Sequence, residues 1–205
     1  MGSEMCIRDS RRRLQNALPV NRISWLRQVH GTLSVKAADD QVPTADAQWT
    51  TDAGRALAVL TADCLPVVLM ARDAGCIGIA HAGWRGLVAG VLESLVVSMP
   101  VAPTTLTAWL GPAISQSAYE VGPAVKDAFQ KVLGDHSGAC FVSSTMQEGH
   151  WMADIYALAQ LHLRRAGVSE IHGGDRCTHR EADHFFSYRR DGALTGRMAT
   201  LIWRT

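Results

Sequence analysis

The chain has 205 residues, of which 47% are hydrophobic and 19% are charged. This length and composition fit one globular domain and exclude a disordered, collagen-like or disulfide-stapled protein. Twenty basic and nineteen acidic side chains leave a net charge of +1, so the composition gives no sign of a nucleic-acid partner or an anionic membrane partner.

The cysteines and the apolar runs indicate where the protein works. Five cysteines, at positions 6, 64, 76, 140 and 177, form no CxxC pair, and an odd number of scattered cysteines is typical of free thiols. We therefore expect a cytoplasmic protein. The longest apolar run, from Ala56 to Met70, is interrupted by Asp63 and Pro66, so it is too short to span a bilayer.

The first ten residues, MGSEMCIRDS, differ in character from the rest of the chain. They lack the apolar core of a signal peptide, and they resemble a translated leader more than part of a fold. We expect residues 1–10 to be a non-native leader and residues 11–205 to form the domain. A helical pattern then opens abruptly near Arg12 with no capping residue before it, which suggests that a natural N-terminus is missing.

The first half of the chain predicts mainly strands. A short strand is expected from Ile23 to Val29, which places His30 between that strand and a turn at Gly31. Apolar runs without polar alternation predict strands that are buried on both faces. These runs are 57–61, 66–70 and 76–80.

The second half mixes helices with strands. Apolar residues at helical spacing predict a helix over 87–99, and Pro123 and Gly134 delimit a second helix over 123–133. A third helix is expected over 152–166, where basic residues follow its last turn. The remaining predicted strands are 106–110, 169–172 and 198–203. This mixture predicts a single-domain α/β fold.

Three residues at the ends of predicted strands have side chains that bind metals: His30, Cys64 and His81. One thiolate and two imidazoles suit tetrahedral zinc and leave its fourth position open for water or substrate, as in a catalytic site. Their spacings of 34 and 17 residues match no zinc-finger pattern, so packing of each residue in the core is the alternative. Small neighbours, including Gly31 and Gly83, would let a ligand approach the backbone.

Asp63 lies inside an apolar run, next to Cys64. A carboxylate in such a position must be paired or solvated in a cleft. Both situations fit a residue that supports a metal ligand or acts as a general base.

Two segments could bind an anion. The stretch from His81 to Gly86 joins a strand to a helix, so backbone N–H groups and Arg85 could hold phosphate, although a plain glycine-rich turn is the alternative. The stretch from Phe185 to Gly192, followed by Arg197, combines aromatic rings with arginines that suit a phosphate or a flat base. An ordinary hairpin with a solvated Asp-Gly turn is the alternative there.

Five short motifs, in this order, resemble those of one known family. They are Gln28-Val29-His30-Gly31, Thr61-Ala62-Asp63-Cys64-Leu65-Pro66, His81-Ala82-Gly83-Trp84-Arg85-Gly86, Gly111-Pro112-Ala113-Ile114 with Tyr119-Glu120-Val121-Gly122, and Phe186-Ser187-Tyr188-Arg189-Arg190-Asp191 with Thr195-Gly196-Arg197. From about Arg11 to its end the chain resembles the YfiH family, whose members are also known as multicopper polyphenol oxidases, purine nucleoside phosphorylases and peptidoglycan editing factors. The family's N-terminal strands and glycine-rich loop have no counterpart before Arg11.

The resemblance implies a four-layer α/β/β/α sandwich with mixed sheets and a set of site residues. It implies metal ligands at His30, Cys64 and His81, catalytic roles for Asp63, Cys64 and His81, and substrate contacts from Gln28, Arg85, Arg189 and Arg190. The implied cofactor is zinc, with copper as the alternative. The implied small-molecule partners are a purine nucleoside and phosphate, and the oligomeric state stays open.

The activity that the resemblance implies is phosphorolysis of adenosine, inosine, guanosine and methylthioadenosine, together with deamination of adenosine. A copper phenol oxidase is one alternative, although the sequence has no His-x-His pair from which a trinuclear copper cluster could be built. A metal-free hydrolase with Cys64 as nucleophile and His81 as base is another. A binding module that keeps the pocket without turnover is the non-enzymatic alternative.

Overall fold

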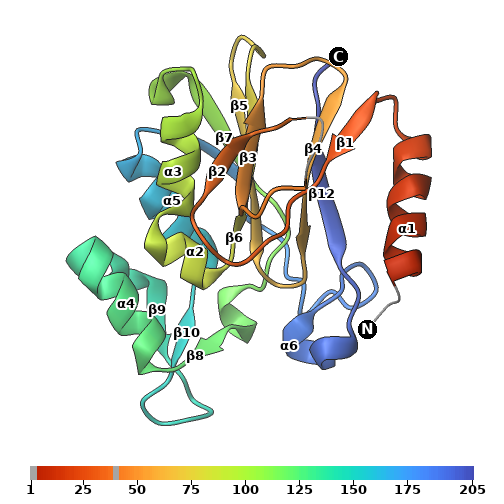
Figure 1. Ribbon diagram of the computed structural model, residues 1–205. Coiled ribbons are helices and arrows are strands. Elements are labelled where there is room, and N and C mark those ends of the chain that lie inside the picture. The colour runs from red at the N-terminus through yellow and green to blue at the C-terminus, as the bar shows by residue number, and fades with distance from the viewer. Residues whose placement is uncertain (1–3, 39–41) are drawn as a thin grey trace.

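A mixed six-stranded sheet lies at the centre of the computed structural model, which describes residues 4–38 and 42–205 (Figure 1). The strand order is β11-β7-β5-β6-β3-β2. These strands are β2 (Ser34–Lys36), β3 (Ala47–Thr50), β5 (Leu65–Ala71), β6 (Ile77–Ala82), β7 (Leu106–Leu110) and β11 (Glu170–Gly173). The inner strands pair antiparallel, whereas the outer pairs β2–β3 and β7–β11 are parallel.

A three-stranded sheet packs on one face of the central sheet. It contains β1 (Arg22–Ser24), β4 (Arg55–Thr61) and β12 (Met198–Ile202), with β4 in the middle. Leu57 and Val59 of β4 meet Val68 and Ile79 of the central sheet in a buried cluster. Because one sheet covers the other, β4, β5 and β6 are buried along almost their whole length, as their apolar runs predict.

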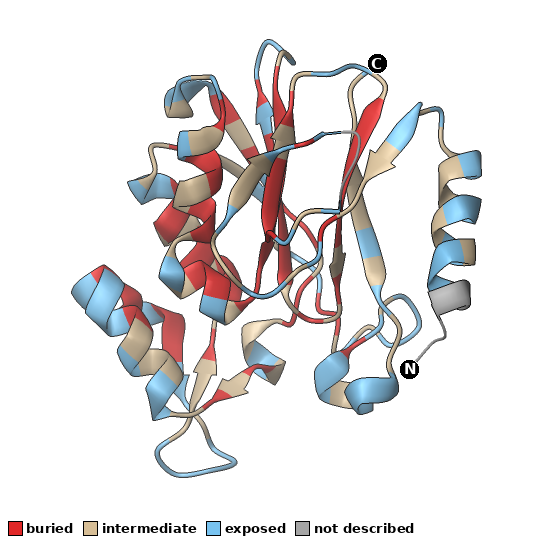
Figure 2. Cartoon of the chain, in the orientation of Figure 1, coloured by how far each residue is buried: buried red, intermediate tan, exposed pale blue. Residues whose placement is uncertain are grey.

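Helices α2 (Trp84–Ala89), α3 (Val91–Ser98) and α5 (Ile155–Arg165) cover the opposite face of the central sheet (Figure 1). Leu92 and Leu95 of α3 and Leu158 of α5 are buried against it in the main core. Figure 2 shows the buried residues concentrated between these helices and the two sheets. None of the helices within residues 4–38 and 42–205 is long and apolar enough to cross a bilayer.

Three peripheral units complete the chain. Helix α4 (Pro123–Leu133) lies beside a small sheet of β8 (Glu120–Val121), β10 (Trp151–Ala153) and β9 (Phe141–Ser143). The short α6 (Tyr188–Asp191) lies in the segment before β12. Helix α1 (Glu4–Ala17) stands outside the three-stranded sheet, beside β1 (Figure 1).

The expected α/β domain with mixed sheets is confirmed, and the layers run from helices through two sheets to α1. The assignment of residues 1–10 to a leader stays a prediction. Residues 4–10 belong to α1, and residues 1–3 lie outside the described part of the chain.

Several predicted elements have different limits in the structure. The helix expected over 87–99 is two helices, because Gly90 adopts a left-handed conformation with φ of 99°. The helix expected over 152–166 begins only at Ile155, where the Asp154 side chain caps it by accepting from the Ala157 N–H. The expected strand over 23–29 has regular pairing only in β1.

The segment at 185–192 forms no hairpin. Ser187 instead caps α6, because its hydroxyl accepts from the Arg190 N–H. In this short helix, the side chains of Arg189 and Arg190 point in different directions and reach different acceptors.

Candidate metal centre and substrate pocket

The three candidate metal ligands come together at one point. His30 follows β1 in a loop, Cys64 directly precedes β5, and His81 lies near the end of β6. One potential ligand atom from each residue lies within 4.8 Å of those from the other two. The Cys64 Sγ atom is 3.9 Å from His30 Nε2, and the two imidazole rings meet edge to face with centroids 4.7 Å apart.

This arrangement fits a single metal ion. At zinc–ligand distances of about 2.0–2.3 Å, tetrahedral geometry places neighbouring donor atoms about 3.3–3.8 Å apart. Small side-chain rotations would bring the three donors from their present spacing to that geometry. The same donors also suit one copper ion. Within residues 4–38 and 42–205, this is the one group of three His, Cys, Asp or Glu side chains whose potential ligand atoms lie together.

Asp46 supports this centre, and the sequence analysis missed it. Its carboxylate is fully buried and lies 2.8 Å from His81 Nδ1. It also accepts hydrogen bonds from the backbone N–H groups of Val29, His30 and Gly31. The available signal was weaker than that for Asp63: an acidic residue between two alanines, followed by the mixed segment Ala47-Gln48-Trp49-Thr50.

The electrostatics of the centre favour a thiolate. Burial opposes ionisation of Cys64, but hydrogen bonds and charge from His30 and His81 outweigh it and lower the pKa of the thiol. Burial likewise opposes protonation of His81, but Asp46 and Cys64 outweigh it and raise the pKa of the imidazole. A thiolate is the form of cysteine that binds a metal.

Gly83 has no side chain, and the side chains of Cys64 and His30 fill the position where its Cβ atom would lie. A Cβ atom added there would lie 2.8 Å from Cys64 Sγ and 2.9 Å from His30 Cδ2. Its backbone is extended, with φ of −66° and ψ of 157°, so conformation does not demand a glycine at this position. The absence of a side chain is what allows His30 and Cys64 to approach the start of α2.

The three ligands line a pocket with a volume of about 720 Å³. Aromatic side chains and arginines surround them. These lining residues include Trp84, Tyr119, Tyr188, Arg85, Arg189 and Arg197. The pocket therefore combines a candidate metal centre with flat rings and positive charge, the groups that suit a heterocyclic base and an anion.

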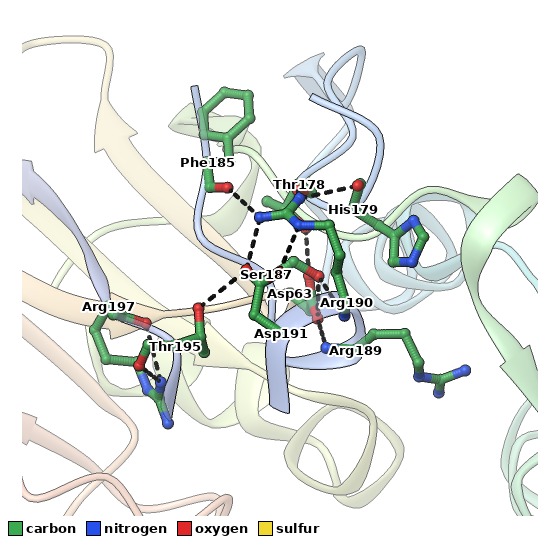
Figure 3. Close-up of polar contacts among 11 residues, drawn as sticks. Asp63, Thr178, His179, Phe185, Ser187, Arg189, Arg190, Asp191, Thr195 and Arg197 are labelled. Atoms are coloured by element: carbon green, nitrogen blue, oxygen red, sulfur yellow. Dashed lines mark hydrogen bonds and ion pairs between the residues drawn. The ribbon is translucent and has the colours of Figure 1, made fainter. Parts of the chain in front are cut away.

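Arg190 lies apart from the other arginines that were considered for substrate binding, and its predicted contact with substrate stays a prediction. Its guanidinium donates to the carbonyl oxygens of Thr178, His179 and Phe185 and pairs with the Asp191 carboxylate. Figure 3 shows Arg190 turned into this cluster, whereas the Arg189 side chain extends away from it. Arg190 does not line the pocket, because the turn of α6 points it into the segment that it braces.

Arg85, Arg189 and Arg197 present positive charge to the pocket. The Arg189 guanidinium lies over the Tyr119 ring and donates to the Glu120 carbonyl oxygen, and that of Arg85 lies over Trp84. Arg197, which sequence analysis noted but did not assign to substrate, completes the set.

Asp63 lines the pocket, but its two carboxylate oxygens are occupied by the C-terminal segment. They accept from Thr178 Oγ1 at 2.6 Å, from Ser187 Oγ at 3.0 Å and from the Arg189 N–H at 2.7 Å (Figure 3). Asp63 has a positive φ of 84°, an uncommon conformation for a residue with a side chain. These contacts tie the residue before Cys64 to the segment that carries Arg189.

Gln28 also lines the pocket, and its amide is held by the backbone of β4. The amide nitrogen donates to the Leu60 carbonyl oxygen and the amide oxygen accepts from the Leu60 N–H, both at 2.8 Å. Gln28 thus pairs with β4 as a strand residue would and fixes the approach of the chain to His30. The structure adds no direct evidence for its predicted contact with substrate.

The fold and the three-ligand centre define an α/β protein with a candidate catalytic metal site. A family model described as "Multi-copper polyphenol oxidoreductase laccase" matches residues 2–205. A protein of Xylella fastidiosa named purine nucleoside phosphorylase is 48% identical over 209 residues, which cover 97% of this chain and 79% of that protein. Escherichia coli purine nucleoside phosphorylase YfiH is 46% identical over 202 residues, which cover 96% and 80%. The chain belongs to this laccase-like family, to which the YfiH proteins also belong.

Solved structures agree with this assignment. A crystal structure of a Neisseria meningitidis protein matches with a TM-score of 0.92 at 44% identity, covering 98% of this chain and 82% of that one. YlmD from Geobacillus stearothermophilus matches with a TM-score of 0.86 at 35% identity, covering 95% and 78%. The mixed α/β fold is therefore that of the family.

Proposed function

We propose that this chain is a zinc-dependent purine nucleoside phosphorylase that also deaminates adenosine. The observation that carries the proposal is one pocket lined by His30, Cys64 and His81 together with three arginines. The relatives named purine nucleoside phosphorylase support the reaction class. Adenosine, inosine, guanosine and methylthioadenosine are the proposed substrates, with phosphate as the second reactant.

The arginines are the proposed phosphate site. In phosphorolysis a phosphate oxygen forms a bond to the anomeric carbon of ribose, while the bond from that carbon to the purine nitrogen breaks and the purine takes up a proton. Arg85, Arg189 and Arg197 would hold the phosphate and orient its attacking oxygen. Guanidinium groups suit this role because they stay charged and match the geometry of phosphate oxygens.

The aromatic side chains are the proposed base site. Trp84, Tyr119 and Tyr188 would pack against the flat purine. Burial raises the pKa of Tyr119, so its hydroxyl stays protonated at neutral pH and can donate a hydrogen bond to a purine nitrogen. Tyr188, whose side chain is exposed at the pocket, can close over a bound base.

Zinc held by His30, Cys64 and His81 would supply a Lewis acid that activates water for deamination. The thiolate character of Cys64 favours this binding. The described cysteines at 64, 76, 140 and 177 are unbridged, which fits a reducing environment, and we propose a cytoplasmic location.

Asp63 has two candidate roles, which one variant separates. Its contacts with Thr178, Ser187 and Arg189 favour a positioning role, whereas the predicted role is that of a proton shuttle. In Asp63→Asn an amide NH2 would face groups that donate, so a positioning role predicts a higher KM for phosphate with a smaller change in kcat. Loss of kcat together with loss of the acidic limb of its pH profile would assign the proton shuttle instead.

The main experiment combines metal analysis with product release. Untagged protein is analysed for zinc and copper, and adenine and inosine release from adenosine is measured with and without phosphate. We expect about one zinc per chain, phosphate-dependent adenine release and phosphate-independent inosine release. Cys64→Ala should remove metal and both activities, whereas Cys140→Ala, whose buried thiol lies outside the pocket, should keep them.

The alternatives give different results. Bound copper with phenol oxidation and no purine release would replace the proposal by the oxidase. Hydrolysis by metal-free protein that depends on Cys64 would replace it by the Cys-His hydrolase. Nucleoside binding without turnover of any substrate would leave a binding module.

A further inference from the structure

The carboxylate of Asp46 is buried at the start of β3, behind the three candidate metal ligands. Its relative exposure is 0%, and four hydrogen-bond donors surround it. A buried carboxylate is costly unless such donors compensate for the loss of water. These donors form two sets. One set comes from the loop around the candidate ligand His30, and the other is the candidate ligand His81.

The first set is the backbone of the loop that carries His30. The N–H groups of Val29 and Gly31 donate to Oδ2 at 3.1 and 2.7 Å, and the N–H of His30 donates to Oδ1 at 3.0 Å. Successive N–H groups can face one anion only when the backbone turns, and His30 has a positive φ of 60°. The Asp46 carboxylate therefore compensates for an uncommon conformation and fixes the point from which the His30 side chain starts.

The second set is His81 itself. Its Nδ1 atom lies 2.8 Å from Asp46 Oδ1, and its backbone N–H donates to the Asp46 carbonyl oxygen at 2.7 Å. A carboxylate oxygen accepts, so Nδ1 carries the proton in this contact. The opposite ring nitrogen, Nε2, is then the atom left for a metal ion.

We propose that Asp46 is the positioning residue of the metal centre: one carboxylate sets both the loop conformation of His30 and the ring orientation of His81. Oδ1 is shared between the two ligands, because it accepts from His30 N–H and from His81 Nδ1. Hydrogen bonds behind metal-bound histidines commonly orient the rings and strengthen binding. This inference rests on the proposed metal centre.

Asp46→Asn tests the proposal with little change in size. Each Asp46 oxygen accepts from two donors, so an amide NH2 group in either orientation faces two groups that also donate. We expect the affinity for Co²⁺ to fall by about ten- to a hundredfold. The absorption bands of the bound Co²⁺, including the thiolate charge-transfer band, should also change.

Asp154→Asn is the matched control. Asp154 is another carboxylate that accepts from a backbone N–H, but it caps α5 and does not line the pocket. Asparagine caps helices about as well as aspartate, so Co²⁺ affinity and spectrum should match those of the wild type. Equal Co²⁺ affinity and equal spectra in Asp46→Asn and wild type would overturn the proposal.

A measurement on the wild type covers the case in which Asp46→Asn does not fold. In protein with ¹⁵N-labelled histidine, the His81 ring signals are assigned by their loss in His81→Gln. We expect a proton on Nδ1, shifted downfield by its hydrogen bond, in both metal-free and Zn²⁺-loaded protein. An unprotonated Nδ1 in either form would refute the role of Asp46. Failure of wild-type protein to bind Co²⁺ would refute the metal centre instead, and the Nδ1 proton of metal-free protein would still decide the orientation of His81.

Discussion

Gly83→Ala probes how closely the candidate metal ligands are packed. The backbone at Gly83 is one that alanine adopts without strain, so the substitution acts through its methyl group. That carbon would lie 2.8 Å from Cys64 Sγ and 2.9 Å from His30 Cδ2. Ordinary contacts between such atoms are about 3.5–4.0 Å, so the two ligands must move apart from Gly83 by about 0.5–1 Å.

This displacement is larger than a metal centre tolerates. Metal–ligand distances in well-formed sites stay within about 0.2 Å of their usual values. We therefore expect Zn²⁺ affinity to fall at least about tenfold, or about 1.4 kcal/mol. The metal-free protein should unfold at nearly the same urea concentration, because the exposed His30 side chain can rotate away and alanine reduces the entropy of the unfolded chain.

The assay is a competition titration with a chromophoric zinc chelator, together with urea unfolding of metal-free protein. Gly138→Ala is the control, because a Cβ there meets nothing within 4 Å. Unchanged Zn²⁺ affinity in Gly83→Ala would show that His30 and Cys64 are not held against Gly83 in the metal-bound protein, and the geometry of the proposed centre would be wrong.

Three further substitutions test the assignments around the pocket. Arg197→Ala should raise the KM for phosphate about ten- to a hundredfold in steady-state kinetics, because a charge-assisted hydrogen bond contributes about 1.5–3 kcal/mol; an unchanged KM would remove Arg197 from the phosphate site. Arg190→Ala should instead lower the melting temperature in a thermal scan, because it releases three carbonyl oxygens, and a change in phosphate KM without loss of stability would contradict this. Leu95→Ala, at a fully buried position of α3, should lower the free energy of urea unfolding by about 2–5 kcal/mol, and a loss below about 1 kcal/mol would mean that the core closes around the cavity.

The sequence alone predicts the elements whose signals are local. Helix α4 occupies the predicted range of 123–133, because proline favours a helix start and glycine a helix end. The apolar runs of β5 and β6 identify strands buried on both faces, since any sheet that holds them must be covered on two sides. His30, Cys64 and His81 could be grouped by their chemistry, because one thiolate and two imidazoles at strand ends suit a metal site, although core packing of each residue was the alternative.

Tertiary structure alone decides which side chains support the site. Asp46 cannot be linked to His81 from spacing, because antiparallel pairing of β3 with β6 is what brings them together. The partners of Asp63 lie 115 to 126 residues away, in a segment with no regular pairing to β5.

The directions of the Arg190 and Arg197 side chains likewise could not be predicted from the sequence. Both are arginines near the C-terminus, but Arg190 of α6 donates to carbonyl oxygens outside the pocket, whereas Arg197 lines the pocket and donates to the carbonyl oxygens of Thr195 and Gly196. Local sequence determines which residues are helical, extended or apolar, because those preferences depend on near neighbours. The direction of a long polar side chain depends on acceptors that packing brings from distant parts of the chain, and this information is present only in the folded structure.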